Sequence, residues 1–106
     1  MQSLRIHSGS NGTSTNAITP ADTFYEISGA TTNQQLIAPA EAKFAIFSAN
    51  GDFYVRYDGS AAVIPTSSSW TTGNQELNPS VRSCVAGDTF DVIAPAATKI
   101  TVAFYA

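Results

Sequence analysis

The sequence predicts an all-β fold: one antiparallel β-sandwich or jelly-roll-like domain of about eight strands. The first observation is composition, because 24 of the 106 residues are serine or threonine, 12% are charged and two are lysine. Helix surfaces rely on Lys, Glu and Arg, whereas hydroxyl-bearing and aromatic residues favour strands. The second is spacing, because short apolar runs recur about every 8–12 residues between Gly, Pro and Asn turn signals, as in sandwiches.

Residues 43–57 (KFAIFSANGDFYVRY) predict a central β-hairpin. Asn50-Gly51 lies between two apolar runs and suits a two-residue type I′ turn, in which both residues need φ > 0. The period of 2 then places these residues on one face: Phe44, Ile46, Phe53, Val55 and Tyr57. It places these on the other: Ala45, Phe47, Tyr54 and Arg56. Both faces are apolar, so we expect the hairpin to be covered on both sides, with these residues in the core: Phe44, Phe47, Tyr54 and Val55. The surplus of Phe and Tyr also indicates that some surface is buried against other subunits.

The chain before the hairpin begins with a short alternation over residues 1–8, which predicts a terminal strand. Residues 8–16 (SGSNGTSTN) are polar and of low complexity, which predicts a flexible arm. We therefore divide the chain into a strand and arm over residues 1–16 and a sandwich over residues 17–106. Residues 23–28 and 35–37 read as strands.

The chain after the hairpin continues with a predicted short strand at 61–64, closed by Pro65. Residues 66–79 (TSSSWTTGNQELNP) have no period and form the one long irregular segment, a kind of loop that often carries function. Three further strands are predicted at 80–85, 89–93 and 99–105.

An internal echo supports two matching layers. Leu36-Ile37-Ala38-Pro39-Ala40 recurs as Val92-Ile93-Ala94-Pro95-Ala96, and each copy is followed by a lysine that opens a strong strand. Proline cannot donate to a strand ladder, so each Ala-Pro-Ala predicts a strand end or corner from which the chain returns as a new strand.

Charge and hydropathy exclude several classes. The formal net charge is −3 and the three arginines are scattered, which argues against nucleic acid as a partner. No apolar run reaches about 18 residues, so no membrane span is predicted. The first residues do not resemble a secretory signal, and a single cysteine allows no internal disulfide. We expect a protein made in a reducing cytoplasm.

Catalytic and metal-binding patterns are weak. His7 and Cys84 are the only residues of their types and lie far apart in the chain, which disfavours a transition-metal site or a nucleophile–histidine arrangement. The carboxylates beside turn glycines have a structural explanation, with calcium at clustered turns as an open alternative. We expect no enzyme activity and no cofactor.

Trp70 is the most informative polar-loop residue. A lone tryptophan among hydroxyl residues can anchor a protein interface, stack on a sugar, or fold back as a lid on the sandwich. Asn74 and Gln75 follow it and could add hydrogen bonds to a sugar.

The segments at 44–65, 76–82 and 89–105, which include NGDFYVRYDG, ELNPSVR and KITVAFY, resemble small virion proteins of tailed bacteriophages. The resemblance implies a capsid cement or decoration protein that binds the major capsid protein or other virion proteins. It also implies a homo-oligomer, often a trimer, located in the virion. The expected contact residues lie in the arm and the loop: Leu4, Arg5, Ile6, His7, Asn11, Trp70, Asn74 and Gln75. The alternative is a receptor- or glycan-binding module on a tail or fibre.

Overall fold

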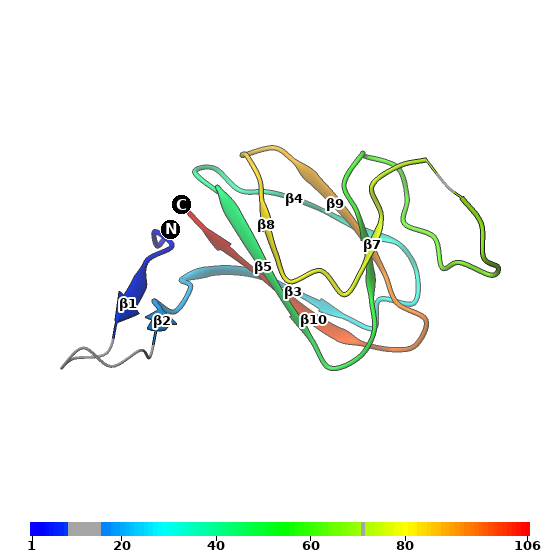
Figure 1. Cartoon of the computed structure of the whole chain (residues 1–106), viewed down its shortest axis with the longest axis horizontal. Coiled ribbons are helices and arrows are strands. Elements are labelled where there is room, and N and C mark those ends of the chain that lie inside the picture. Colours follow the sequence, from blue (N-terminus) through cyan, green and yellow to red (C-terminus); the bar gives the residue numbers. More distant parts are fainter. Residues whose placement is uncertain (9–15, 71) are drawn as a thin grey trace.

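A computed structural model describes residues 1–8, 16–70 and 72–106 (Figure 1). The described residues form strands and no helix, so none could cross a membrane as a helix. The all-β prediction is confirmed. The strands are β1 (Ile6–Ser8), β2 (Asn16–Ile18), β3 (Thr23–Ser28), β4 (Gln34–Ile37), β5 (Phe44–Ala49), β6 (Tyr54–Arg56), β7 (Glu76–Leu77), β8 (Val81–Ser83), β9 (Thr89–Ile93) and β10 (Lys99–Tyr105).

Strands β3 to β10 build two antiparallel sheets of four strands each, which confirms the β-sandwich. We call β3-β10-β5-β8 the first sheet and β4-β9-β6-β7 the second sheet. Every connection from β3 onward passes from one sheet to the other, except the connection from β6 to β7. The chain therefore builds both layers together.

The predicted Asn50-Gly51 hairpin is wrong. β5 belongs to the first sheet and β6 to the second, so these residues form a corner between sheets. Neither residue has the positive φ that a type I′ turn requires. Asn50 instead continues the pairing with β10, because its N–H donates to Lys99 O (3.2 Å) and its Oδ1 accepts from Lys99 N (3.0 Å). A Cβ on Gly51 would lie 3.2 Å from Thr98 Oγ1, so glycine here permits close approach.

The corner changes which side chains share a layer. Phe47 of the first sheet and Phe53 beside the second face each other across the core, with ring centroids 6.1 Å apart. Phe47 and Val55 are buried as predicted. Phe44 and Tyr54, also predicted as core, are only half-buried, because their positions point outward from the two sheets.

The core is aromatic at its centre. Phe90 on β9 is 1% exposed and has its ring within about 6 Å of three others, those of Phe47, Tyr57 and Phe104. Removing a buried ring of this kind typically destabilises a domain by about 3–5 kcal/mol. The aromatic cluster joins the two sheets.

The two similar sequence segments occupy equivalent places in the fold. The two copies, β4 and β9, pair with each other in the second sheet, and the strands that follow them, β5 and β10, pair in the first. Each Ala-Pro-Ala carries the chain from the second sheet to the first, with Ala38 and Ala94 buried at the two corners. The predicted corners are confirmed.

Two features project from opposite ends of the sandwich (Figure 1). At one end, near both termini, β1 and β2 pair as a hairpin from Ile6↔Ile18 to Ser8↔Asn16. Residues 1–5 are tied to the body, because Leu4 N donates to Ala106 O (3.2 Å) and Ala106 N donates to Gln2 O (2.8 Å). The predicted boundary between residues 16 and 17 falls inside β2.

At the other end, the segment between β6 and β7 forms a long excursion, which we call the 57–75 loop (Figure 1). The strand predicted at 61–64 is wrong, since these residues belong to this loop. Pro65 therefore does not end a strand, contrary to the prediction. The apolar run instead faces the outside of the second sheet, as its contacts show.

Candidate functional site at the 57–75 loop

The 57–75 loop lies across the outer face of the second sheet. Phe90 and Val92 point into the core, so Asp91 between them points outward, opposite Arg56 of β6. Asp91 is nevertheless only 2% exposed. The loop supplies the cover that buries it.

A hydrogen-bonded carboxylate fastens the loop to the sheet. Asp91 Oδ1 accepts from Asn33 Nδ2 at 3.0 Å, and Gln35 Nε2 lies 3.3 Å from both carboxylate oxygens. Asn33 Oδ1 in turn accepts from the N–H of Ala62 in the loop at 2.8 Å. Because a buried carboxylate is costly without such donors, this network specifies where the loop lies.

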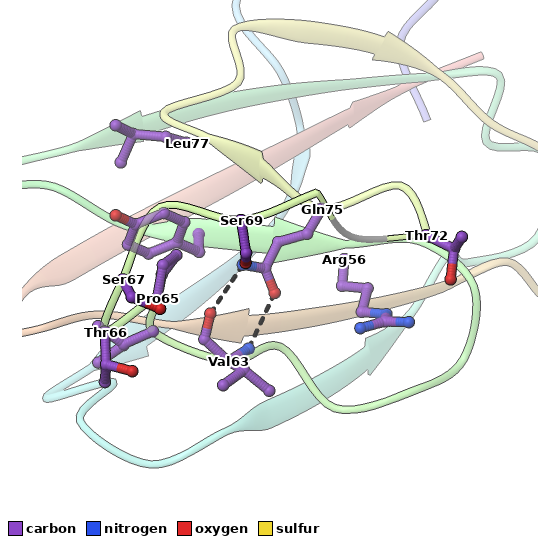
Figure 2. Close-up of a pocket in the computed structure, with 12 residues that line it drawn as sticks. Arg56, Val63, Pro65, Thr66, Ser67, Ser69, Thr72, Gln75 and Leu77 are labelled. Atoms are coloured by element: carbon purple, nitrogen blue, oxygen red, sulfur yellow. Dashed lines mark hydrogen bonds between the residues drawn. The ribbon is translucent and has the colours of Figure 1, made fainter.

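Two predicted contact residues, Asn74 and Gln75, hold the loop in shape. Gln75 Oε1 accepts from Val63 N (2.8 Å) and its Nε2 donates to Val63 O (2.7 Å), so the amide acts as a strand partner for the opposite side of the loop (Figure 2). Asn74 Oδ1 accepts from Tyr57 N at 3.1 Å. These groups are engaged within the protein, which leaves them less able to bind a ligand.

Arg56 of β6 is a charged side chain that lies beneath the 57–75 loop. Its Nε and Nη2 donate to Asp58 Oδ1 and Oδ2 at 2.7 and 2.9 Å. This pairing, together with the N–H of Ser60, lowers the pKa of Asp58 to about 2. Gly73 passes directly over the guanidinium at φ 119°, and a Cβ there would lie 2.8 Å from Arg56 Nη2. Only glycine fits that passage without displacing the arginine.

Between the loop and the sheet lies an open cleft of about 510 Å³. Its lining is mixed: aliphatic side chains and one proline alternate with hydroxyls, one amide, one tyrosine and one arginine (Figure 2). The lining residues are Tyr54, Arg56, Val63, Ile64, Pro65, Thr66, Ser67, Ser69, Thr72, Gly73, Gln75 and Leu77. Apolar walls with scattered hydroxyls suit a neutral polar molecule such as a saccharide better than a multiply charged one.

Trp70 stands apart from this cleft. Its side chain is fully exposed, at 104% of the reference value, and it does not line the cleft. The interpretation of Trp70 as a lid folded onto the sandwich is therefore wrong. A large apolar side chain held in water at a loop is typical of a contact residue.

Beside the loop, Tyr57, Glu76 and Arg82 form a cluster at the edge of the core. Arg82 Nε donates to Glu76 Oε1 at 2.7 Å, a second bond joins Nη2 to Oε2, and this pairing lowers the pKa of Glu76. Burial, and then the Glu76 carboxylate, raise the pKa of the Tyr57 hydroxyl. Near neutral pH the Glu76–Arg82 pair is therefore charged and the Tyr57 hydroxyl is neutral.

The described part of the predicted arm, residues 4–7, lies at the other end of the molecule from the 57–75 loop, so these residues and Trp70 do not form one site (Figure 1). Leu4 is half-buried and Arg5 is exposed. Ile6 and His7 belong to β1, and Asn11 lies outside the described residues. The Cys84 thiol is buried, and burial, with Asp88 nearby, raises its pKa. No group of three His, Cys, Asp or Glu residues able to hold a metal occurs in the part of the chain that the structure describes.

Sequence reasoning missed one surface, on the outer face of the first sheet. The registers place Phe24, Ala103, Ile46 and Val81 in one row across all four strands. The signal was present in the surplus of apolar residues at 44–57, but assigning those residues to a hairpin put them on the wrong faces. Comparison with known protein families, curated proteins and solved structures finds no match to this chain.

Proposed function

We propose that this chain is a structural protein of a bacteriophage virion, made in the host cytoplasm and without enzyme activity. It stabilises the particle as a cement or decoration protein, by binding the major capsid protein or other virion proteins. The proposal rests on the resemblance of the sequence to such proteins. The observation that carries it is the placement of two projecting features, the β1–β2 hairpin and the loop that bears Trp70, on opposite ends of a molecule whose longest extent is 51 Å.

We also infer a jelly-roll topology. Jelly rolls arrange eight strands in two sheets as a pair of Greek keys, and viral capsid domains are among the proteins that use them. The strand orders β3-β10-β5-β8 and β4-β9-β6-β7 support this inference, as does the regular crossing between sheets. Fold alone does not fix function, so this adds support by analogy.

Trp70 is the expected anchor at one end. Interface tryptophans that fill a partner's pocket contribute about 2 kcal/mol or more, or roughly thirtyfold in affinity. Since Trp70 is the only tryptophan, its fluorescence reports its burial directly. Binding to a capsid should shift the emission to the blue and reduce quenching by acrylamide.

The test is addition of the purified protein to capsids that lack it. We expect the protein to sediment with the capsids and to raise the temperature at which they disrupt. Trp70→Ala should weaken binding roughly thirtyfold, whereas Thr72→Ala, an exposed position in the same loop, should leave it unchanged. Failure of the wild-type protein to bind capsids would contradict the proposal.

A second variant tests the role of the β1–β2 hairpin in capsid binding. Ile6 and Ile18 are opposite each other, so residues 7–17 can be replaced by an Asn-Gly turn that keeps residues 1–5 attached to Ala106. We expect a folded protein with an unchanged melting temperature and weaker capsid binding. Capsid binding equal to that of the wild type would remove the hairpin from the proposed contact.

A glycan-binding role on a tail or fibre is the second candidate. It is favoured by the mixed apolar and hydroxyl lining of the cleft and by Trp70 on the same loop. Titration of host-surface polysaccharide should then change the Trp70 fluorescence, and Tyr54→Ala should abolish the change. Absence of any change with polysaccharide, together with capsid binding, would decide for the first candidate.

A further inference from the structure

The outer face of the first sheet carries a continuous apolar row. Phe24 of β3 is opposite Ala103 of β10, Ala103 is opposite Ile46 of β5, and Ile46 is opposite Val81 of β8. Phe24 is 54% exposed and Val81 is 43% exposed, at the two ends of the row. Directly opposed residues on one face are close enough for their side chains to touch, so the row is one surface.

The outer face of a sandwich sheet is normally polar, because alternate residues point to water. The second sheet also has exposed apolar side chains at outward positions, Ile37 and Leu77, but they lie on its two edge strands and do not form a row across it. The exposures of Phe24 and Val81 show that no described segment covers the row on the first sheet. An uncovered apolar row across a whole sheet indicates a contact surface.

The charges on this face suit contact with itself. Among the outward positions of the four strands, the side chains that are charged at neutral pH are Glu26 on β3 and Lys99 on β10. The face therefore carries no net charge, although the whole chain carries −3. Two copies that meet through this face therefore do not accumulate charge of one sign.

We propose that this face binds the same face of a second copy of this chain. The two sheets would pack at the spacing of about 10 Å that is usual for stacked sheets. Such a contact is isologous, so it makes a two-fold dimer. The trimer implied by the resemblance would need a different surface. The proposal does not depend on the virion role.

The size of the face sets the expected strength. Four strands about 4.8 Å apart and a central strand of seven residues, each rising about 3.3 Å, give a face of about 400 Å². Two copies would bury about 800 Å², below the roughly 1,200 Å² of stable interfaces. We therefore expect a weak dimer that forms reversibly at micromolar to millimolar concentrations.

Sedimentation velocity over a range from about 10 μM to about 1 mM, which brackets a weak interface, tests the proposal. Wild-type protein should shift from monomer to dimer over this range. Val81→Glu and Phe24→Glu should each weaken the dimer about tenfold or more, because each buries an unpaired carboxylate. Ile37→Glu is the matched control: Ile37 is 63% exposed at the outward end of a strand in the second sheet, and its substitution should have no effect.

A charge swap provides a second test that leaves the apolar row intact. Glu26→Lys and Lys99→Glu each give the face two like charges and should weaken the dimer, while the double swap should restore it. The proposal is overturned if the protein stays monomeric at all these concentrations, or if an oligomer forms that Val81→Glu and Phe24→Glu do not affect. A monomer that still binds capsids would leave the proposed function standing.

Discussion

The two sheets of this sandwich have outer faces of opposite kinds. The outer face of the second sheet is covered at its centre by the chain's own 57–75 loop, over a buried carboxylate, Asp91, held by side-chain amides, while Ile37 and Leu77 on its edge strands stay exposed. On the outer face of the first sheet the chain covers the end at Tyr105, which is buried and donates its hydroxyl to Thr19 O, and leaves uncovered the apolar row from Phe24 to Val81.

The difference shows how the polarity of a sheet face is related to whether the chain itself covers that face. The loop is fixed in one position through Asn33, whose Oδ1 accepts from Ala62 N–H of the loop while its Nδ2 donates to the buried Asp91 carboxylate, since a shift of the loop breaks this directional network. An apolar row has no such directionality, and it gains by contact with any apolar surface of matching shape. The covered face therefore stabilises one conformation of the chain, and the bare face is available to a partner.

The largest expected effect is a difference in stability between substitutions at the centres of the two outer faces. Asp91→Asn replaces an acceptor with an amide that must point a donor at Asn33 or Gln35, so we expect a loss of about 2–3 kcal/mol in the free energy of unfolding. Thr101→Val, an isosteric change on the outward side of β10, should change it by less than about 0.5 kcal/mol. Urea denaturation of both variants measures the difference. Equal losses of unfolding free energy in the two variants would show that the Asp91 network stabilises its face no more than Thr101 stabilises the other.

The next effect concerns the fit of the loop over Arg56. Gly73→Ala adds a Cβ in a left-handed region and against the guanidinium, which should cost about 1.5 kcal/mol. Gly29→Ala, also at positive φ but with no atom within 4 Å of the added Cβ, isolates the backbone strain and should cost about 1 kcal/mol. Thermal denaturation compares them. A smaller loss for Gly73 than for Gly29 would contradict the contact.

A smaller effect is expected on the bare face of the monomer. Phe24→Thr keeps a residue that favours strands and removes only a half-exposed ring, so the unfolding free energy of dilute protein should change by about 0.5 kcal/mol. The melting temperature of concentrated protein should fall more than that of dilute protein. Equal shifts at both concentrations would mean that Phe24 acts only within the monomer.

The smallest effect is acid titration of the loop. The pKa of Asp58 is lowered from 3.8 to about 2, so the contact with Arg56 contributes fully above pH 3.8 and is lost as the pH falls through about 2. Arg56→Gln should return the carboxyl midpoint toward 3.8. Carbon NMR of the side-chain carboxyl follows this midpoint. Because the pair is exposed, little change in overall stability should accompany it.

Local patterns in the sequence predicted the all-β class and both Ala-Pro-Ala corners, because proline and turn residues act where they stand. They did not predict the role of Asn50-Gly51. These residues tolerate many backbone conformations, and the one adopted depends on β10, which follows about fifty positions later and pairs with β5 up to the corner.

The same reason limited prediction of the candidate site. Trp70 was identified from the composition of the segment around it, as a large apolar residue among hydroxyl-bearing residues. The cleft was not, because the position of the loop depends on Asn33 bonding both Asp91 and Ala62, contacts that join three distant segments. Asn74 and Gln75 had the right polarity for ligand binding, but that polarity serves the loop.

The contrast between the two faces is tested most directly by methyl NMR in a dilution series of the wild-type protein. We predict that the signals of Ile46 and Val81 on the bare face move with concentration, while those of Ile37 on the second sheet and Val63 on the 57–75 loop, which are also exposed, stay fixed. Movement of the Ile37 and Val63 signals, or no movement at any site, would contradict a bare face that binds a second copy.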